Sequence, residues 1–206
     1  MAPDDLTSRL DFLLAADALK QVLRRNPLTD GSRRENTAEH SWHIALMALV
    51  LSEHAAEPVD LWRVVRMLLV HDLVEVHAGD TFVYDEAARL GKEAAEREAA
   101  DRIFGMLPDP QRDELHALWE EFETADTPEA RYARAVDRLS PLLLNHASGP
   151  GNAWLAHGVT ADRVLARNEP IGEALPEVWE EAKRRVSDAV DRGFLDPTPG
   201  AAGPDG

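Results

Sequence analysis

A histidine and an aspartate, His71 and Asp72, stand directly after an apolar run at residues 64–70 that only Arg66 interrupts. A helix of that composition is buried, and an ionisable side chain at its end needs a partner because burying an unpaired polar group is costly. Imidazole nitrogen and carboxylate oxygen together suit a divalent cation. For the dipeptide alone, the alternative is a core histidine bonded to the backbone beside a capping aspartate.

The composition limits the partners that such a chain can have. The 206 residues suffice for one sizeable core, and the 38 acidic against 22 basic residues give a net charge of −16. A surface of that sign repels phosphate backbones, so we expect no nucleic-acid polymer as partner. The absence of cysteine excludes disulfides, thiolate metal sites and cysteine nucleophiles. With no signal-peptide pattern and no apolar run of membrane-spanning length, we expect a soluble, cytoplasmic protein that does not bind a membrane.

Apolar spacing and helix-terminating residues predict a single all-α domain over residues 1–195. We expect a loop at 28–35 and no strand. The tail at 196–206, rich in Pro and Gly, has the composition of a disordered end. The predicted helices lie at residues 5–24, 36–55, 59–77, 86–106, 110–123, from 128 onward, 160–167 and 174–192.

The second predicted helix begins at a capping box, because Asn36 is followed three residues later by Glu39. His40 lies in its first turn. The rest of this helix carries one apolar stripe, formed by Trp42, Ala45, Leu46, Leu49 and Val50.

Four residues on successive predicted core helices share the chemistry of metal ligands: His40, His71, Asp72 and Asp137. Two imidazoles and two carboxylates leave room in an octahedral shell for water and substrate. Each has an ordinary interpretation singly, since His40 can bond locally and Asp137 can pair with Arg134 or Arg138. Taken together, in this order, they favour one metal site.

Three segments carry a resemblance to a known family: Glu35-Asn-Thr-Ala-Glu-His40-Ser, the run from His71 to Asp80, and Ala135-Val-Asp137-Arg-Leu. Their order and spacing resemble the HD-domain superfamily of metal-dependent phosphohydrolases. The match is closest to the branch that contains the bacterial 5′-deoxynucleotidase, and it covers about residues 10–147. The resemblance implies a single HD-domain helical bundle.

Carried over position by position, the resemblance implies that the four candidate ligands hold one divalent ion (Co, Mn, Zn, Fe, Ni or Mg). Glu75 matches the acidic residue that handles the proton of the attacking water, and Asp80 matches a contact to the sugar hydroxyl. Arg25 matches the phosphate-binding arginine, and Arg33 is a second candidate for that role. In the nucleotidase an aromatic residue follows this arginine, whereas this chain has Asn26.

The implied activity is hydrolysis of a small phosphate monoester, a nucleoside or deoxynucleoside 5′-monophosphate, through attack of metal-bound water. Two rival functions remain at this point. One is a di-iron HD-type oxygenase, which metal content would distinguish. The other is a non-catalytic nucleotide-binding regulator, against which the presence of Glu75 argues. The scattered apolar positions of residues 86–123 are compatible with a homodimer.

Overall fold

The structure, a computed structural model, describes residues 5–80, 84 and 91–198. Helices make up most of this part, so the predicted all-α class is confirmed. The α-helices are α1 (Asp5–Ala16), α2 (Thr37–Val50), α3 (Leu61–Val70), α4 (Glu75–Ala78), α5 (Lys92–Phe104), α6 (Asp109–Thr124), α7 (Pro128–Ala147), α8 (Ala153–Ala156), α9 (Ala161–Asn168), α10 (Ile171–Ala174) and α11 (Pro176–Asp191). The 3₁₀ turns are η1 (Asp17–Gln21), η2 (Ser52–His54), η3 (His71–Val74) and η4 (Gly149–Gly151), and the strands are β1 (Leu23–Pro27) and β2 (Arg34–Asn36).

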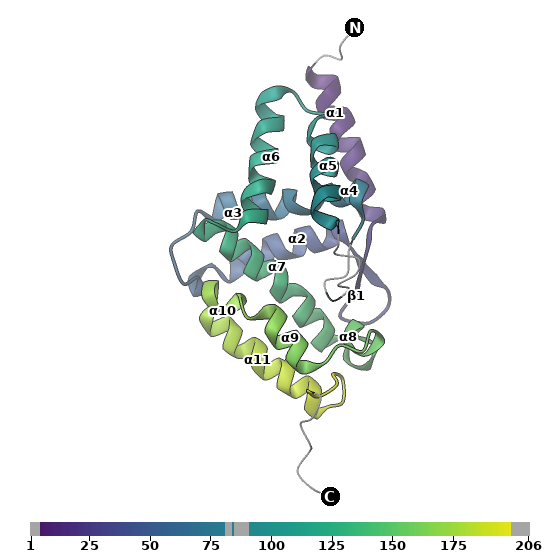
Figure 1. Cartoon of the computed structure of the whole chain (residues 1–206), viewed down its shortest axis with the longest axis vertical. Coiled ribbons are helices and arrows are strands. Elements are labelled where there is room, and N and C mark those ends of the chain that lie inside the picture. The colour runs from purple at the N-terminus through teal and green to yellow at the C-terminus, as the bar shows by residue number, and fades with distance from the viewer. Residues whose placement is uncertain (1–4, 81–83, 85–90, 199–206) are drawn as a thin grey trace, which may run out of the picture.

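Helix α7 runs through the middle of the molecule, with α5 and α6 towards one end and α8 to α11 towards the other (Figure 1). It begins where the sequence predicts, because Pro128 takes the first helical position and the Thr127 side chain accepts a hydrogen bond from the Ala130 amide. Buried residues such as Val136 and Leu139 pack against α2, α3 and the C-terminal helices. The other elements that carry the candidate metal centre, described below, are positioned relative to this helix.

The predicted helix at 59–77 is interrupted at the candidate ligands His71 and Asp72. Helix α3 ends at Val70, residues His71–Val74 form the 3₁₀ turn η3, and α4 follows from Glu75. The expectation of one continuous helix is therefore wrong, since periodicity does not reveal a tightening from α to 3₁₀ geometry. Gly79 ends the segment with φ of +75°, a conformation that favours glycine.

The absence of strands was also a wrong expectation. Helix α1 ends at Ala16, and the chain then folds into an antiparallel hairpin of β1 and β2, with Leu23 opposite Asn36 and Pro27 opposite Arg34. The connecting turn forms at Asp30-Gly31, within the loop predicted at 28–35. Gly31 has φ of +68°, and its amide donates to the Leu28 carbonyl over 2.9 Å. This hairpin delivers Arg24 and Glu35 to the site.

The C-terminal helices pack on the far half of α7. The Pro-Gly segment at 148–158 contains η4 and α8. The predicted tail begins at Asp196, which forms an isolated parallel bridge with Thr160. Residues 199–206 lie outside the described residues, so the domain boundary stays a prediction. None of the helices in the described ranges is long and apolar enough to cross a membrane.

Candidate metal centre

The turn η3 places His71 and Asp72 between the two apolar clusters of the fold, one around α7 and one between α1, α5 and α6. The His71 ring is 4% exposed, and its centroid lies 4.5 Å from that of Phe122. Its Nδ1 is 3.0 Å from the Leu68 carbonyl, which fixes the proton on Nδ1. The Nε2 atom therefore faces Asp72 Oδ1 at 3.0 Å.

His40 and Asp137 complete the group from two other helices. His40 is fully buried in the first turn of α2, where the predicted capping box between Asn36 and Glu39 is present. Its Nε2 lies 2.9 Å from Asp137 Oδ1 on α7 and 3.9 Å from Asp72 Oδ2. The four predicted ligands thus converge, and the ligand atoms of His40, His71 and Asp72 lie within 4.8 Å of one another.

These residues fit a divalent cation. The hydrogen bond from His71 Nδ1 to the Leu68 carbonyl leaves Nε2 directed at the Asp72 carboxylate. This arrangement needs a positive charge between the imidazole nitrogen and the carboxylate oxygens. Burial lowers the pKa of His71, but the charge and hydrogen bond of Asp72 together with the charge of Asp137 raise it to about 9. Burial raises the pKa of Asp72, but the charge and hydrogen bond of His71 together with the charges of Arg24 and His40 lower it to about 2. A set of two nitrogens and two carboxylates suits a borderline metal ion.

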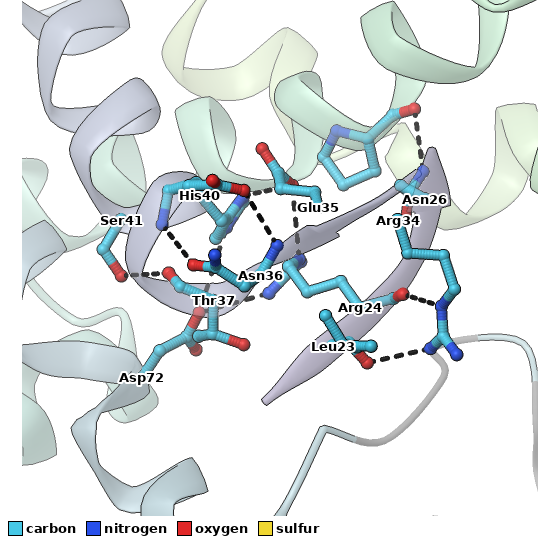
Figure 2. A network of polar contacts seen from close by, with 12 residues as sticks. Leu23, Arg24, Asn26, Arg34, Glu35, Asn36, Thr37, His40, Ser41 and Asp72 are labelled. Atoms are coloured by element: carbon cyan, nitrogen blue, oxygen red, sulfur yellow. Dashed lines mark hydrogen bonds and ion pairs between the residues drawn. The ribbon is translucent and has the colours of Figure 1, made fainter. Parts of the chain in front are cut away.

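Arg24 is a site residue that sequence reasoning missed. On β1 its side chain turns inward and is 13% exposed, with Nη1 donating to Asp72 Oδ2 over 3.2 Å (Figure 2). The predicted Arg25 lies next to it but is exposed, although it also lines the cavity described below. Successive side chains of a strand point to opposite faces, which separates these two arginines. A prediction that this segment ends a helix does not reveal this alternation.

Glu35 is a second missed residue, and it lies between Arg24 and His40 in Figure 2. It is 3% exposed, and its Oε2 is 3.5 Å from His40 Nδ1 and 3.8 Å from Arg24 Nε. Within the described residues, neither nitrogen has a hydrogen-bond partner. A carboxylate near the outer nitrogen of a metal-ligating histidine is a common supporting arrangement.

Glu75, the predicted proton-handling residue, opens α4 beside this group. It is 5% exposed, and the Thr37 hydroxyl donates to its Oε2 over 2.9 Å. Burial, followed by the Asp72 charge, raises the pKa of Glu75 to about 8. Asp80 follows shortly after the end of α4, and burial raises its pKa as well. Both carboxyl groups therefore hold protons more readily than ordinary acidic side chains.

The structure does not bring Arg33 to this site, so its assignment as a phosphate contact is corrected. Arg33 lies on the exposed side of the hairpin turn and forms a bidentate pair with Glu39, with distances of 2.6 and 2.8 Å. It does not line the cavity. Its charge is already matched by the glutamate that completes the capping box of α2.

A cavity of about 190 Å³ opens from the metal side of the site. Its lining includes His71, Asp72, Glu75, Asp80 and Asp137, together with Arg24, Arg25 and Asn26. The lining also includes aromatic and cationic side chains, among them Tyr84, Phe122, Arg134, Arg138 and Trp154. The space is suited to a small anionic ligand with a flat apolar part.

Comparison with known proteins places the chain in a family. The model of the HD domain matches residues 16–179. The chain belongs to the HD-domain family. The match extends beyond the resemblance seen in the sequence at residues 10–147 and includes most of the C-terminal helices.

Similar proteins carry names that agree with the predicted enzyme class. A solved structure called a predicted metal-dependent phosphohydrolase, from Magnetospirillum magnetotacticum, is 47% identical, covers 95% of this chain and 100% of its own, and has a TM-score of 0.87. The human 5′-deoxynucleotidase HDDC2 is 34% identical over 66% of each chain. The 5′-deoxynucleotidase of Erwinia tasmaniensis is 27% identical over 71% of this chain and 79% of its own. The chain thus spans about two thirds to four fifths of these curated relatives.

Proposed function

We propose that this HD-domain protein is a metal-dependent phosphohydrolase that releases phosphate from a nucleoside or deoxynucleoside 5′-monophosphate. The observation that carries the proposal is the convergence of His40, His71 and Asp72, next to Asp137, on a cavity that also holds Glu75 and Arg24. The names of the relatives supply the substrate class. We also propose that the enzyme acts in the cytoplasm, where its substrates are found, and that it is a homodimer.

In this proposal His40, His71, Asp72 and Asp137 hold one divalent ion. When bound, such an ion polarises a phosphoryl oxygen and lowers the pKa of an attacking water. The His71 ring is held in ligand orientation by the Leu68 carbonyl, and the Glu35 carboxylate lies 3.5 Å from the outer nitrogen of His40. The described residues contain one such group of candidate ligands, which favours a single metal over a di-iron centre.

Arg24 and Arg25 supply the positive charge that a phosphate monoester requires in so acidic a protein. Arg24 is buried beside the ligand Asp72, where a guanidinium can form charge-assisted bonds to phosphoryl oxygens. Arg25, the arginine predicted by the resemblance, stands at the cavity wall. We assign the larger share of transition-state stabilisation to Arg24, because charge is more effective in a water-poor site.

Glu75 handles the proton in the proposed reaction. Its carboxyl group is buried, opens α4 beside the candidate ligands and is held by the Thr37 hydroxyl, where as a carboxylate it can accept a proton from the attacking water. The proton can then pass to the leaving oxygen of the sugar. Asp80 lines the same cavity, and in this proposal it contacts a sugar hydroxyl, as the resemblance implies.

The direct test is phosphate release from a panel of nucleoside and deoxynucleoside 5′-monophosphates. Metal-stripped protein is assayed after addition of Co²⁺, Mn²⁺, Zn²⁺ or Mg²⁺, and Asp72→Ala serves as the matched control. We expect release only with metal and only from the unsubstituted protein. Tight nucleotide binding without release would instead support a regulator, and two irons per chain with oxygen consumption would support an oxygenase.

A further inference from the structure

Asn26 is a buried amide in the lining of the cavity that no step of the proposed reaction uses. The residue is 7% exposed, and it lines the cavity together with Arg24 of the same strand. One residue separates the two on β1, so both side chains point to the same face of the strand, roughly 7 Å apart along it. Because Arg24 is bonded to the candidate ligand Asp72, Asn26 lies one step farther from the candidate metal centre.

The Asn26 amide is held in a fixed orientation. Its Nδ2 donates to the carbonyl of Pro141 on α7 over 3.3 Å (Figure 2). Strand β1 is itself held by Arg34, whose guanidinium donates to the carbonyls of Leu23 and Arg24. Among the described residues, no group donates to Asn26 Oδ1, and the atom is not enclosed by protein. The side chain therefore offers its oxygen, a hydrogen-bond acceptor, to the cavity.

The proline within α7 adds a second acceptor close by. Pro141 has no amide hydrogen, so the carbonyl of Asp137, four residues earlier, lacks the donor that a regular helix supplies. Both residues line the cavity, and so does the carboxyl group of Asp80. The carbonyl that anchors Asn26 lies one helical turn, about 5.4 Å, beyond Asp137. A ligand bound at the metal centre therefore meets hydrogen-bond acceptors about one turn away.

The shape of a nucleotide matches this arrangement. In a nucleoside 5′-monophosphate the sugar ring follows the phosphate through one oxygen and one carbon. With the phosphate beside Arg24 and the candidate ligands, the sugar lies at the level of Asn26 and Pro141. A sugar hydroxyl is a donor that an amide oxygen accepts. The proposed contact with Asp80 uses one hydroxyl, which is all that a deoxyribose offers in such a nucleotide, whereas ribose carries a second one at the 2′ position.

We propose that Asn26 Oδ1 accepts a hydrogen bond from a 2′-hydroxyl and that this protein prefers ribonucleoside over deoxyribonucleoside 5′-monophosphates. The inference rests on the proposed function and narrows its substrate class. A 2′-deoxy substrate leaves the acceptor without its partner, and sites built around a hydroxyl reject analogues that lack it. Water can replace part of the lost bond in an open cavity, so we expect a preference of about 10- to 100-fold.

The kcat/KM values for adenosine and 2′-deoxyadenosine 5′-monophosphate test the proposal, because the two substrates differ only at the 2′ position. We expect the unsubstituted protein to prefer the ribonucleotide and Asn26→Leu, which has a similar volume but no acceptor, to lose the preference. Arg33→Ala, on the same hairpin but outside the cavity, is the matched control and should keep it. A ratio measured on one preparation is independent of the fraction of folded protein.

Binding of the same two nucleotides to metal-stripped protein gives a measurement that needs no turnover. By isothermal titration calorimetry we expect tighter binding of the ribonucleotide to the unsubstituted protein and equal binding of both to Asn26→Leu. If neither nucleotide releases phosphate with any metal, the proposed function fails, and the ratio of the two affinities still decides the role of Asn26.

Two results would overturn the inference. One is an unsubstituted protein that treats both nucleotides alike or prefers the deoxynucleotide. The other is an Asn26→Leu variant that weakens both substrates by the same factor and keeps the preference. The second result is what a purely structural link between β1 and α7 predicts.

Discussion

The two sides of α2 reverse the usual distribution of polar and apolar residues. The side that faces α7 and the hairpin buries polar groups, namely Thr37, His40 and Ser41. The outer side exposes Trp42, Leu46, Leu49 and Val50 to solvent. Between them Ile44 and Ala48 are fully buried in the ordinary way.

Each reversal carries a free-energy cost that a partner removes. Buried ionisable groups are stable only when they are paired or hold an ion, which is the role proposed for the inner side. Exposed apolar side chains, such as those of the outer side, are stabilised when a second surface covers them. A single helix therefore carries candidate ligand chemistry on one side and an exposed apolar surface on the other, and substitutions can separate the two.

The largest expected effect follows from removing an inner-side ligand. His71→Ala or Asp72→Ala should abolish both metal retention and turnover, because a site with four protein ligands loses one of them and leaves a buried charge unmatched. Metal content by atomic emission and phosphate release on the same preparation measure this. Full occupancy and full activity in both variants would contradict the single-site assignment.

The next effect separates proton transfer from metal binding. Glu75→Gln keeps the shape of the side chain and an oxygen for the Thr37 hydroxyl, but it removes the basicity. We expect metal content near that of the unsubstituted protein and a kcat lower by roughly 10²–10⁴. A kcat within a few-fold would reduce Glu75 to a structural role, and loss of metal would make it a ligand.

The same variant has a signature in the stability of the metal-free protein. Folding raises the pKa of Glu75 from 4.5 to about 8, so the native state holds the proton more tightly and stability falls as pH rises between these values. Glu75→Gln does not titrate. Its melting temperature relative to the unsubstituted protein should therefore increase across this pH window when both are measured in chelator. A constant difference would show that Glu75 is ionised in the fold.

The third effect compares neighbouring arginines on β1. Arg24→Ala should lower kcat/KM by roughly 30- to 1000-fold, the equivalent of about 2–4 kcal/mol for a lost charge-assisted contact in a partly dry site. Arg25→Ala should cost less, because that side chain is exposed. Arg33→Ala serves as the control, since its partner is Glu39. If Arg25→Ala has the larger effect, the phosphate position drawn from Arg24 is wrong.

A smaller effect is expected from Glu35, which lies next to the candidate ligand His40. Glu35→Gln removes the negative charge beside His40 Nδ1 and Arg24 Nε while keeping the volume. Loss of such a supporting carboxylate typically weakens metal affinity or activity by about 10- to 100-fold. Competition with a fluorescent chelator measures the affinity directly. An affinity equal to that of the unsubstituted protein would separate Glu35 from the metal site.

The smallest effect is expected on the outer side. Leu49→Glu should leave kcat per chain within about twofold, since surface positions away from the site change stability by only about ±0.5 kcal/mol. Steady-state kinetics at saturating metal and substrate test this. A collapse of kcat together with dissociation would mean that association is required for the chemistry, and the two sides of α2 would then not be independent.

Local rules of the sequence determined much of this protein. The helices at Asn36 and Pro128 begin where capping residues require them, and His40, His71 and Asp72 come together next to Asp137 as the resemblance implies. The identity of Glu75 as a buried acid beside them also follows from the sequence. These features depend on interactions within a few residues or on a motif of fixed spacing.

Tertiary structure decided the rest. Which arginine of the pair at 24 and 25 turns inward depends on the hairpin, which packing creates from a segment that resembles a helix end and a loop. Whether the stripe on α2 is core or surface depends on the side from which α7 packs. Periodicity reports that a face is apolar, but only the placement of distant elements determines what covers it.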